Sequence, residues 1–172
     1  MVYCMARESQ AKHRGAEQHR ADPVRHPPGS SLLGDNLATA VIEKIDYNFE
    51  KLQVGSLTAA VVGLRSALLD KWTSGFLSRH SYATVAHLAC GFNTRSHWIS
   101  WSDGVRWIDI DLRNAVQFWK SLMPDPLNAN NYTFLAGSAL DRTLIESPPN
   151  DRSIIVVIEG LVPYFTTAEE KQ

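Results

Sequence analysis

The stretch TVAHLACGFNTRSHW, residues 84–98, decides the fold. It begins as an apolar run that is typical of a buried strand, and it breaks at Gly91 into a short polar turn that contains Thr94 and Arg95. A single glycine after a buried strand lets a ligand approach the backbone closely, but it also suits an ordinary turn between a strand and a helix. This stretch alone does not distinguish a ligand-binding loop from an ordinary turn, so the other segments of the sequence are needed.

Three more stretches have the character of strands: VRWIDID (105–111), NYTFLAG (131–137) and RSIIVVIEG (152–160). Helical patterns separate them, in LRNAVQFWKSLM (112–123) and more briefly in SALDRTLIESPPND (138–151), and another short helical piece follows Gly91. Strands that alternate with helices predict an α/β protein with a doubly wound parallel sheet of the Rossmann-like type. The sequence accounts for four strands of such a sheet, so we expect a partial one.

Two helical patterns precede the first strand. The first begins at a cap, Asp35 or Asn36, and its apolar residues recur at steps of three and four: Leu37, Val41, Ile45, Phe49 and Leu52. The second begins at Ser56, and its apolar residues also share one stripe: Leu57, Val61, Leu64, Leu68, Trp72 and Phe76. Residues 1–31 are polar, rich in Arg and His, and closed by PPGSS, which predicts a disordered tail. Residues 32–172 are expected to form one partial domain.

The composition is that of an ordinary folded protein, with 172 residues, 44% hydrophobic residues and a formal net charge of -1. This charge argues against nucleic acid or an anionic membrane as a partner. Cys4 and Cys90 make no disulfide framework and lack the spacing of metal ligands, so we expect no metal site. The sequence has neither the apolar segment of a signal peptide nor a run of roughly 18 apolar residues, which predicts a cytoplasmic protein.

Candidate site residues follow three of the predicted strands. In an open parallel sheet, ligands bind outside the carboxyl ends of the strands, where Gly91, Asp111 and Glu159 stand. An acid at the end of the second strand, about 20 residues after the loop glycine, is suited to accept both hydroxyls of a ribose. The loop has one glycine where a dinucleotide fingerprint needs three, so a nucleoside without phosphates fits better. On these residues alone, a nucleoside cradle and a simple turn beside a solvated carboxylate remain equally compatible.

Three segments, in order, carry a resemblance to a known family: residues 65–95 (RSALLDKWTSGFLSRHSYATVAHLACGFNTR), 105–112 (VRWIDIDL) and 154–170 (IIVVIEGLVPYFTTAEE). Together they resemble the leucine carboxyl methyltransferase superfamily, in the branch of tetracenomycin-type polyketide O-methyltransferases. The shared pattern is an Arg and an Asp on a helix, a glycine loop that ends in Thr-Arg, a tryptophan before an acidic strand end, and Glu-Gly-Leu after the fourth strand.

The resemblance implies an S-adenosylmethionine-dependent methyltransferase fold and a role for individual residues. Arg65 would pair with the carboxylate of the cofactor, Gly91 would form part of the cofactor loop, and Asp111 would hold the ribose. Ala139 and Leu140 would lie against the adenine, and Glu159 would line the cofactor near the methyl-transfer centre. The implied reaction is in-line methyl transfer from S-adenosylmethionine to a carboxyl or hydroxyl oxygen of a small, polyketide-like molecule in secondary metabolism. No catalytic side chain is assigned.

The chain also departs from the family pattern. Ala89 stands in place of the first loop glycine, Asn93 in place of the loop aspartate, and Ala139 lacks the carboxylate that would accept the adenine amino group. Family members continue with further strands and helices, so we expect this chain to be C-terminally truncated. The alternative function is therefore a non-catalytic remnant that binds cofactor weakly, or that acts only by pairing with another copy through its exposed fourth strand.

Overall fold

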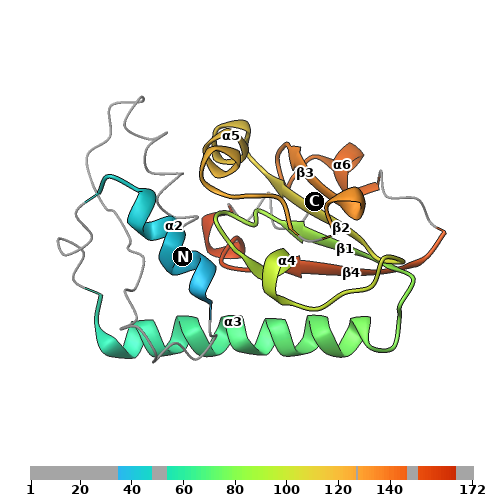
Figure 1. The fold of residues 1–172 in the computed structure, drawn as a ribbon, viewed down its shortest axis with the longest axis horizontal. Coiled ribbons are helices and arrows are strands. Elements are labelled where there is room, and N and C mark those ends of the chain that lie inside the picture. The colour runs from blue at the N-terminus through green and yellow to red at the C-terminus, as the bar shows by residue number, and fades with distance from the viewer. Residues whose placement is uncertain (1–34, 48–53, 127, 147–150, 166–172) are drawn as a thin grey trace.

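A computed structural model of the protein describes residues 35–47, 54–126, 128–146 and 151–165. Its four strands form one parallel sheet in the order β3-β2-β1-β4, with β1 at Ala83–Leu88, β2 at Arg106–Asp111, β3 at Tyr132–Ala136 and β4 at Ser153–Ile158. Helices lie on both faces of this sheet (Figure 1). The predicted α/β fold of the Rossmann-like type, with these four strands, is confirmed.

The strand order places a topological switch point between β1 and β4, because the chain leaves β1 toward β2 and β3 before it returns to the other side. All six residues of β1 are buried, since a strand lies on each side of it and helices cover it. Leu88 is paired with Ile110 of β2 and with Ile158 of β4, so the three carboxyl ends meet at one edge of the sheet. This edge is the place where the sequence predicts the site.

Helix α2 (Asn36–Lys44) begins at the predicted cap, since the side chain of Asp35 accepts a hydrogen bond of 2.9 Å from the backbone N–H of Ala38. Its last residue, Lys44, donates from Nζ to the carbonyl of Leu122 at 2.9 Å and so ties α2 to the end of α5 (Arg113–Leu122). The predicted continuation of the pattern through Phe49 and Leu52 lies outside the described residues.

Helix α3 (Ser56–Leu77) runs along one face of the sheet for 22 residues (Figure 1). The helix is confirmed, but its stripe of apolar residues lies mostly on the outer side, with Leu57 78% and Trp72 59% exposed. The buried side instead carries the small or polar residues Gly63, Asp70 and Thr73, together with Leu77. On this side Asp70 contacts Arg95 and Leu77 packs against the sheet, and apolar spacing alone cannot reveal these contacts.

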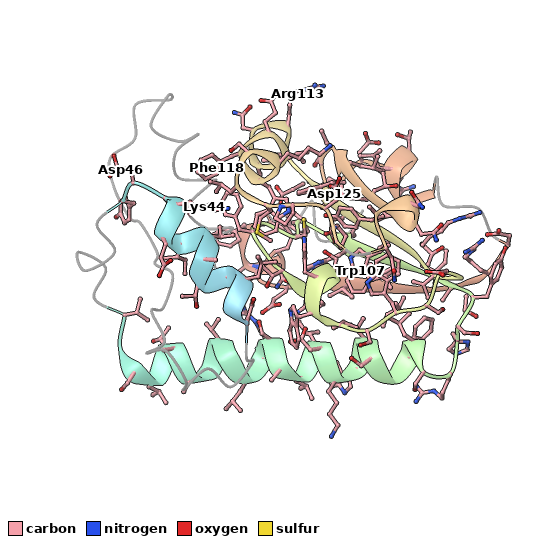
Figure 2. The ribbon with its side chains drawn as sticks, viewed as in Figure 1. Lys44, Asp46, Trp107, Arg113, Phe118 and Asp125 are labelled. Carbon is pink, nitrogen blue, oxygen red and sulfur yellow. The ribbon has the colours of Figure 1, made fainter. Side chains whose placement is uncertain are left out.

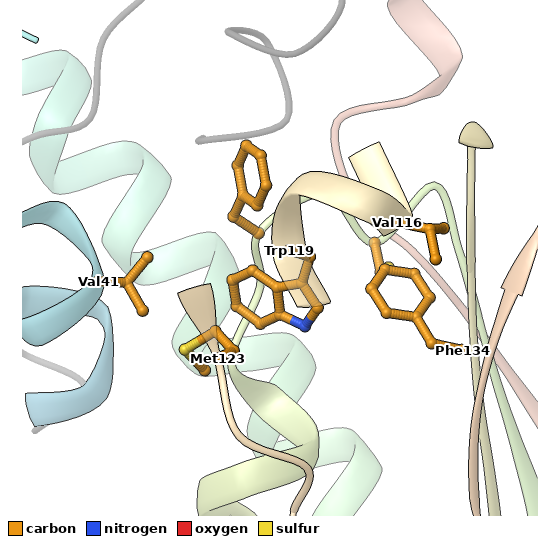
Figure 3. Close-up of a cluster of buried hydrophobic side chains, with 7 residues drawn as sticks. Val41, Val116, Trp119, Met123 and Phe134 are labelled. Carbon is orange, nitrogen blue, oxygen red and sulfur yellow. The ribbon is translucent and has the colours of Figure 1, made fainter. Parts of the chain in front are cut away.

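Two buried clusters hold the layers together. Between the sheet and α3, Trp107 is fully buried with Leu77, Val85 and Val157 around it. On the other face, side chains from α2, α5 and β3 form a second cluster that includes Val41, Val116, Trp119, Met123 and Phe134 (Figure 3). Arg113 and Phe118 lie on the outer side of α5 (Figure 2).

The predicted short helices are present as α4 (Arg95–Trp98) and α6 (Arg142–Glu146), and two 3₁₀ turns, η3 (Ala129–Asn131) and η4 (Val162–Tyr164), complete the elements. Strand β4 lies at one edge of the described sheet, with Ile154, Val156 and Ile158 38 to 50% exposed. No helix in the described ranges is long and apolar enough to cross a membrane. The predicted tail, residues 1–31, lies outside those ranges.

Candidate functional site

The loop that follows β1 turns sharply back toward the end of β2. Ala89 and Gly91 have φ values of 51° and 59°, a left-handed backbone that suits glycine and strains alanine. The N–H of Cys90 donates to the carbonyl of Ile110 at 3.2 Å, and the N–H of Gly91 donates to Asp111 Oδ2 at 2.7 Å. Both main chain and side chain therefore fasten the loop to the end of β2.

Asp111 joins three elements at this edge of the sheet. Its carboxylate is buried, and besides the loop N–H it accepts a hydrogen bond of 2.6 Å from the N–H of Leu112, the residue that caps α5. Its carbonyl accepts from the N–H of Gly137, just past β3, at 2.8 Å. The loop after β1, the start of α5 and the end of β3 are thus held around one buried carboxylate.

A small cavity of about 20 Å³ lies beside this carboxylate. Its lining includes three residues that the sequence predicts for the site, Asp111, Ala139 and Leu140, together with Ala89, Leu112, Gly137, Ser138, Leu161 and Phe165. Leu161 packs on Ala89, and Ala139 and Phe165 lie against that pair. Because small-molecule pockets usually measure about 300 to 1,000 Å³, this apolar cluster fills much of the space that a nucleoside would need.

The other two predicted residues, Arg65 of α3 and Glu159 at the end of β4, form an ion pair, with Arg65 Nε 3.1 Å from Glu159 Oε1. Ser66 donates to the same carboxylate oxygen at 2.7 Å. Burial raises the pKa of Glu159, but hydrogen bonds from Ser66 and Arg95 and the charge of Arg95 outweigh it and lower the pKa to about 2. The Arg65 side chain is 45% exposed, so its remaining N–H groups are accessible to an anion.

Arg95 is buried beside the ion pair of Arg65 and Glu159, with 1% of its side chain exposed. Its Nη2 donates to Glu159 Oε2 at 2.9 Å, its Nε donates to Asp70 Oδ1, and its Nη1 lies 3.2 Å from His87 Nε2. A guanidinium only donates, so His87 Nε2 accepts and the ring proton is on Nδ1. Residues from α3, β1, α4 and the end of β4 are therefore joined by one side chain.

Asp109 has a structural role, because it is buried and hydrogen-bonded to neighbouring side chains and does not line the small cavity beside Asp111. Its carboxylate accepts hydrogen bonds of 2.8 Å from the indole N–H of Trp107 and from the hydroxyl of Tyr132, and His87 Nδ1 is 3.4 Å from it. Burial, together with the charge of Asp109, raises the pKa of Tyr132, which stays a neutral donor. Within the described part of the chain, no three His, Cys, Asp or Glu side chains are grouped as metal ligands.

The structure thus divides the six predicted site residues into two neighbouring groups. Asp111, Ala139 and Leu140 line the small cavity, with Gly91 hydrogen-bonded to Asp111, and Arg65 and Glu159 form the ion pair. The end of β4 connects them, because Glu159 belongs to the ion pair while Leu161, two residues later, packs on Ala89 in the cavity. Gly160, between them, has a φ of 68° and makes this change of direction possible.

A larger cavity, of about 250 Å³, lies elsewhere, between the end of α5 and the start of β3. Trp119, Met123 and Tyr132 are part of its lining, and none of the predicted site residues is. It lies away from the carboxyl ends of the strands, where the predicted site residues lie, so we do not assign the site to it.

Two residues around the ion pair, Asp70 and Arg95, have no role assigned from the sequence. Asp70 was recognised only as part of the helix pattern, and Arg95 only as a residue of the glycine loop. Asp70 and Arg95 form an ion pair because α3 packs along one face of the sheet. A local sequence pattern does not reveal this packing. The available signal was the occurrence of an Asp and an Arg in the two segments that carry the family resemblance.

No family model matches the chain. Among curated proteins, it is 32% identical over 155 residues to the tetracenomycin polyketide synthesis O-methyltransferase TcmP of Streptomyces glaucescens. It is 30% identical over 162 residues to the S-adenosyl-L-methionine-dependent methyltransferase dpfgK of Gibberella zeae. These matches cover 90% and 87% of this chain, but only 56% and 54% of the two relatives. The chain spans about half the length of the curated relatives that it matches.

The likeness covers almost the whole chain. The fold agrees with it, because the chain forms a four-stranded parallel sheet, and Asp111 and Glu159 lie at the strand ends around the switch point. The expected resemblance to tetracenomycin-type polyketide O-methyltransferases is therefore confirmed. We conclude that the chain is similar, over most of its own length, to S-adenosylmethionine-dependent methyltransferases such as the tetracenomycin polyketide O-methyltransferase.

Proposed function

We propose that this protein binds S-adenosylmethionine at the carboxyl edge of β1, β2 and β4, as part of an O-methyltransferase of small molecules. The observation that carries the proposal is the buried Asp111 carboxylate, which holds the Gly91 loop and lines the cavity with Ala139 and Leu140. The acceptor would be a carboxyl or hydroxyl group of a polyketide-like molecule in secondary metabolism. The free, buried thiol of Cys90 suits a reducing compartment, so a cytoplasmic location is part of the proposal.

The residues fit the two ends of the cofactor differently. Asp111 would accept hydrogen bonds from the ribose, and Ala139 and Leu140 would lie against the adenine once Leu161 and Phe165 yield the space that they fill. At the amino-acid end, Arg65 would bind the carboxylate through a planar fork of donors. Glu159 would remain ionised near the reacting centre, because the neighbouring donors hold its pKa near 2.

When bound, the cofactor supplies an electrophilic methyl group on a sulfonium. The chain's own residues contribute by positioning the cofactor, because the Gly91 loop, Asp111 and the ion pair of Arg65 with Glu159 lie at the ends of rigid strands. None of the described side chains is assigned the removal of the acceptor's proton.

Isothermal titration with S-adenosylmethionine tests the proposal. We expect saturable one-to-one binding by the full chain, and a loss of at least tenfold in affinity for Asp111→Ala. Asp103→Ala, a matched change at an exposed carboxylate on the loop before β2, should bind as the unchanged chain does. An absence of binding at millimolar cofactor would rule the proposal out, and equal losses in the two variants would rule out the role of Asp111.

A second candidate function is that of a non-catalytic remnant that acts through pairing with a second copy. It is favoured by the exposed edge of β4, whose residues Ile154, Val156 and Ile158 are apolar and whose strand contains neither charge, glycine nor proline. Two such edges pair in an antiparallel manner about a two-fold axis, which gives a continuous sheet through both copies.

A further inference from the structure

Four charged side chains form a continuous series of ion pairs beside the end of β4. Arg65 contacts Glu159, Glu159 contacts Arg95, and Arg95 contacts Asp70. We call these four residues the charge quartet. Two positive and two negative groups give it a formal charge of zero, which explains how three largely buried members are tolerated.

One atom of the quartet is left without a partner. Asp70 is 5% exposed, and its Oδ2 is buried and has no hydrogen-bond partner among the described residues. Arg95 cannot turn toward this atom, since its Nε, Nη1 and Nη2 already contact Asp70 Oδ1, His87 and Glu159. A buried carboxylate oxygen without a donor is unfavourable, so a feature of this kind is unusual in a folded protein.

Asp70, which carries the unpaired oxygen, lies beside the ion pair of Arg65 and Glu159. Ser66, one helical turn before Asp70 on α3, donates to Glu159 Oε1 at 2.7 Å, so Asp70 and Glu159 lie against the same side of the helix. Arg95 Nε and Nη2 contact these two carboxylates, which brings them close to each other. A ligand with a donor group could therefore satisfy the unpaired oxygen, and an ammonium group is the donor that a carboxylate binds most strongly.

We infer that Asp70 Oδ2 accepts the α-ammonium group of the cofactor's amino-acid end while Arg65 takes its carboxylate, so that the charge quartet is a receptor for an amino-acid zwitterion. This inference rests on the proposed function. A zwitterion adds one charge of each sign, so every charge keeps an opposite neighbour and no net charge is buried. In agreement with this, burial and the charge of Glu159 together raise the pKa of Asp70 more than Arg95 lowers it, and a bound ammonium group would oppose that rise.

The test uses a pair of ligands and needs no activity. Binding of S-adenosylhomocysteine is compared by titration with that of its analogue in which the α-amino group is replaced by hydrogen. The unchanged chain should bind the analogue about 10- to 100-fold more weakly, because a hydrogen bond between charged groups is lost. In Asp70→Asn, which keeps an oxygen for Arg95 Nε but removes the negative charge, the two ligands should bind within about twofold of each other.

Thr73→Val is the matched control. Thr73 is buried on the same helix, and its hydroxyl donates to the carbonyl of Leu69 and does not contact the quartet. This variant should keep the full preference for the amino-bearing ligand, because it does not alter the charge quartet. A loss of the preference in both Thr73→Val and Asp70→Asn would indicate a general loss of helix packing instead. A control that loses the preference would therefore overturn the assignment of Asp70.

The outcomes separate this inference from the proposed function. If the unchanged chain binds both ligands equally, the receptor is ruled out while cofactor binding stands. If it binds neither, the proposed function fails, and the inference with it. If Asp70→Asn does not fold, which circular dichroism reports, the comparison of the two ligands on the unchanged chain still decides the question.

Discussion

The carboxylate of Asp111 accepts a hydrogen bond of 2.7 Å from the backbone N–H of Gly91, 20 residues earlier in the chain. The acid therefore has a structural role before any ligand binds, because it fixes the loop that follows β1. If Asp111 also binds the ribose, as we propose, its substitution should change two measured quantities, the stability of the protein and its affinity for the cofactor.

Asp111→Ala should lower the free energy of unfolding by about 3 kcal/mol, because two buried N–H groups, those of Gly91 and Leu112, lose their acceptor. Urea denaturation followed by circular dichroism measures the loss. Asp103→Ala, at an exposed position, should change it by less than about 0.5 kcal/mol. A loss below about 1 kcal/mol for Asp111→Ala would contradict the anchoring role.

Ala89→Gly should leave the stability within about 1 kcal/mol of the original. Relief of left-handed strain contributes about 1 to 2 kcal/mol, and it is offset by the lost methyl and by the greater freedom of glycine in the unfolded chain. The same denaturation experiment on Ala86→Gly, in the extended backbone of β1, should give a clear loss of about 1 to 2 kcal/mol. Equal losses in both variants would mean that Ala89 is not strained.

Arg95→Met and Arg65→Met should differ strongly, although both arginines contact Glu159. Loss of the buried Arg95 charge leaves the buried Asp70 without its ion-pair partner and Glu159 with Arg65 alone, and should destabilise the protein by about 3 to 5 kcal/mol. Loss of the half-exposed Arg65 should cost about 0 to 1 kcal/mol. Denaturant midpoints measure both, and similar values would show that burial does not decide the strength of these pairs.

Glu159 should make the stability depend on acid. Its pKa is lowered in the folded protein from an ordinary value of 4.5 to about 2, so the folded state binds this proton less readily than the unfolded chain does. The stabilisation is complete above pH 4.5 and is lost as the pH falls toward 2. The difference in unfolding free energy between the unchanged chain and Glu159→Gln should therefore shrink over this range.

Val156→Lys should abolish self-association if β4 pairs with a second copy, because a charged side chain on an edge strand opposes pairing. Sedimentation velocity over a range of concentrations measures the change. Thr133→Lys is the matched control, because it places the same charge at an exposed position on β3, at the opposite edge of the sheet. A monomeric unchanged chain would exclude the pairing altogether.

The strands and most helices were predictable because their signals are local. Apolar runs bounded by turn residues indicated all four strands, and Asp35 was one of two caps named for α2. The orientation of α3 was not predictable, since its buried side includes Asp70, whose partner Arg95 lies 25 residues later in the sequence. Apolar spacing pointed to Leu57 and Trp72, which are exposed.

The site residues show the same limit. Gly91 and Asp111 were predictable as a pair because one follows the first strand and the other ends the second, about 20 residues later. The central position of Arg95 was not predictable, because its partners come from α3, β1 and the end of β4. Long-range ion pairs of this kind leave no trace in local periodicity.

The left-handed turn at Gly160 has a mechanical consequence. Glu159 is held by Ser66, Arg65 and Arg95, whereas Leu161 occupies the cavity beside Ala89, and the two are separated by this single residue. Because only Gly160 separates them, a displacement of Leu161 from the cavity should also shift the carboxylate that the arginines hold. The bindings of a nucleoside and of an amino acid, added as separate fragments, should therefore depend on each other.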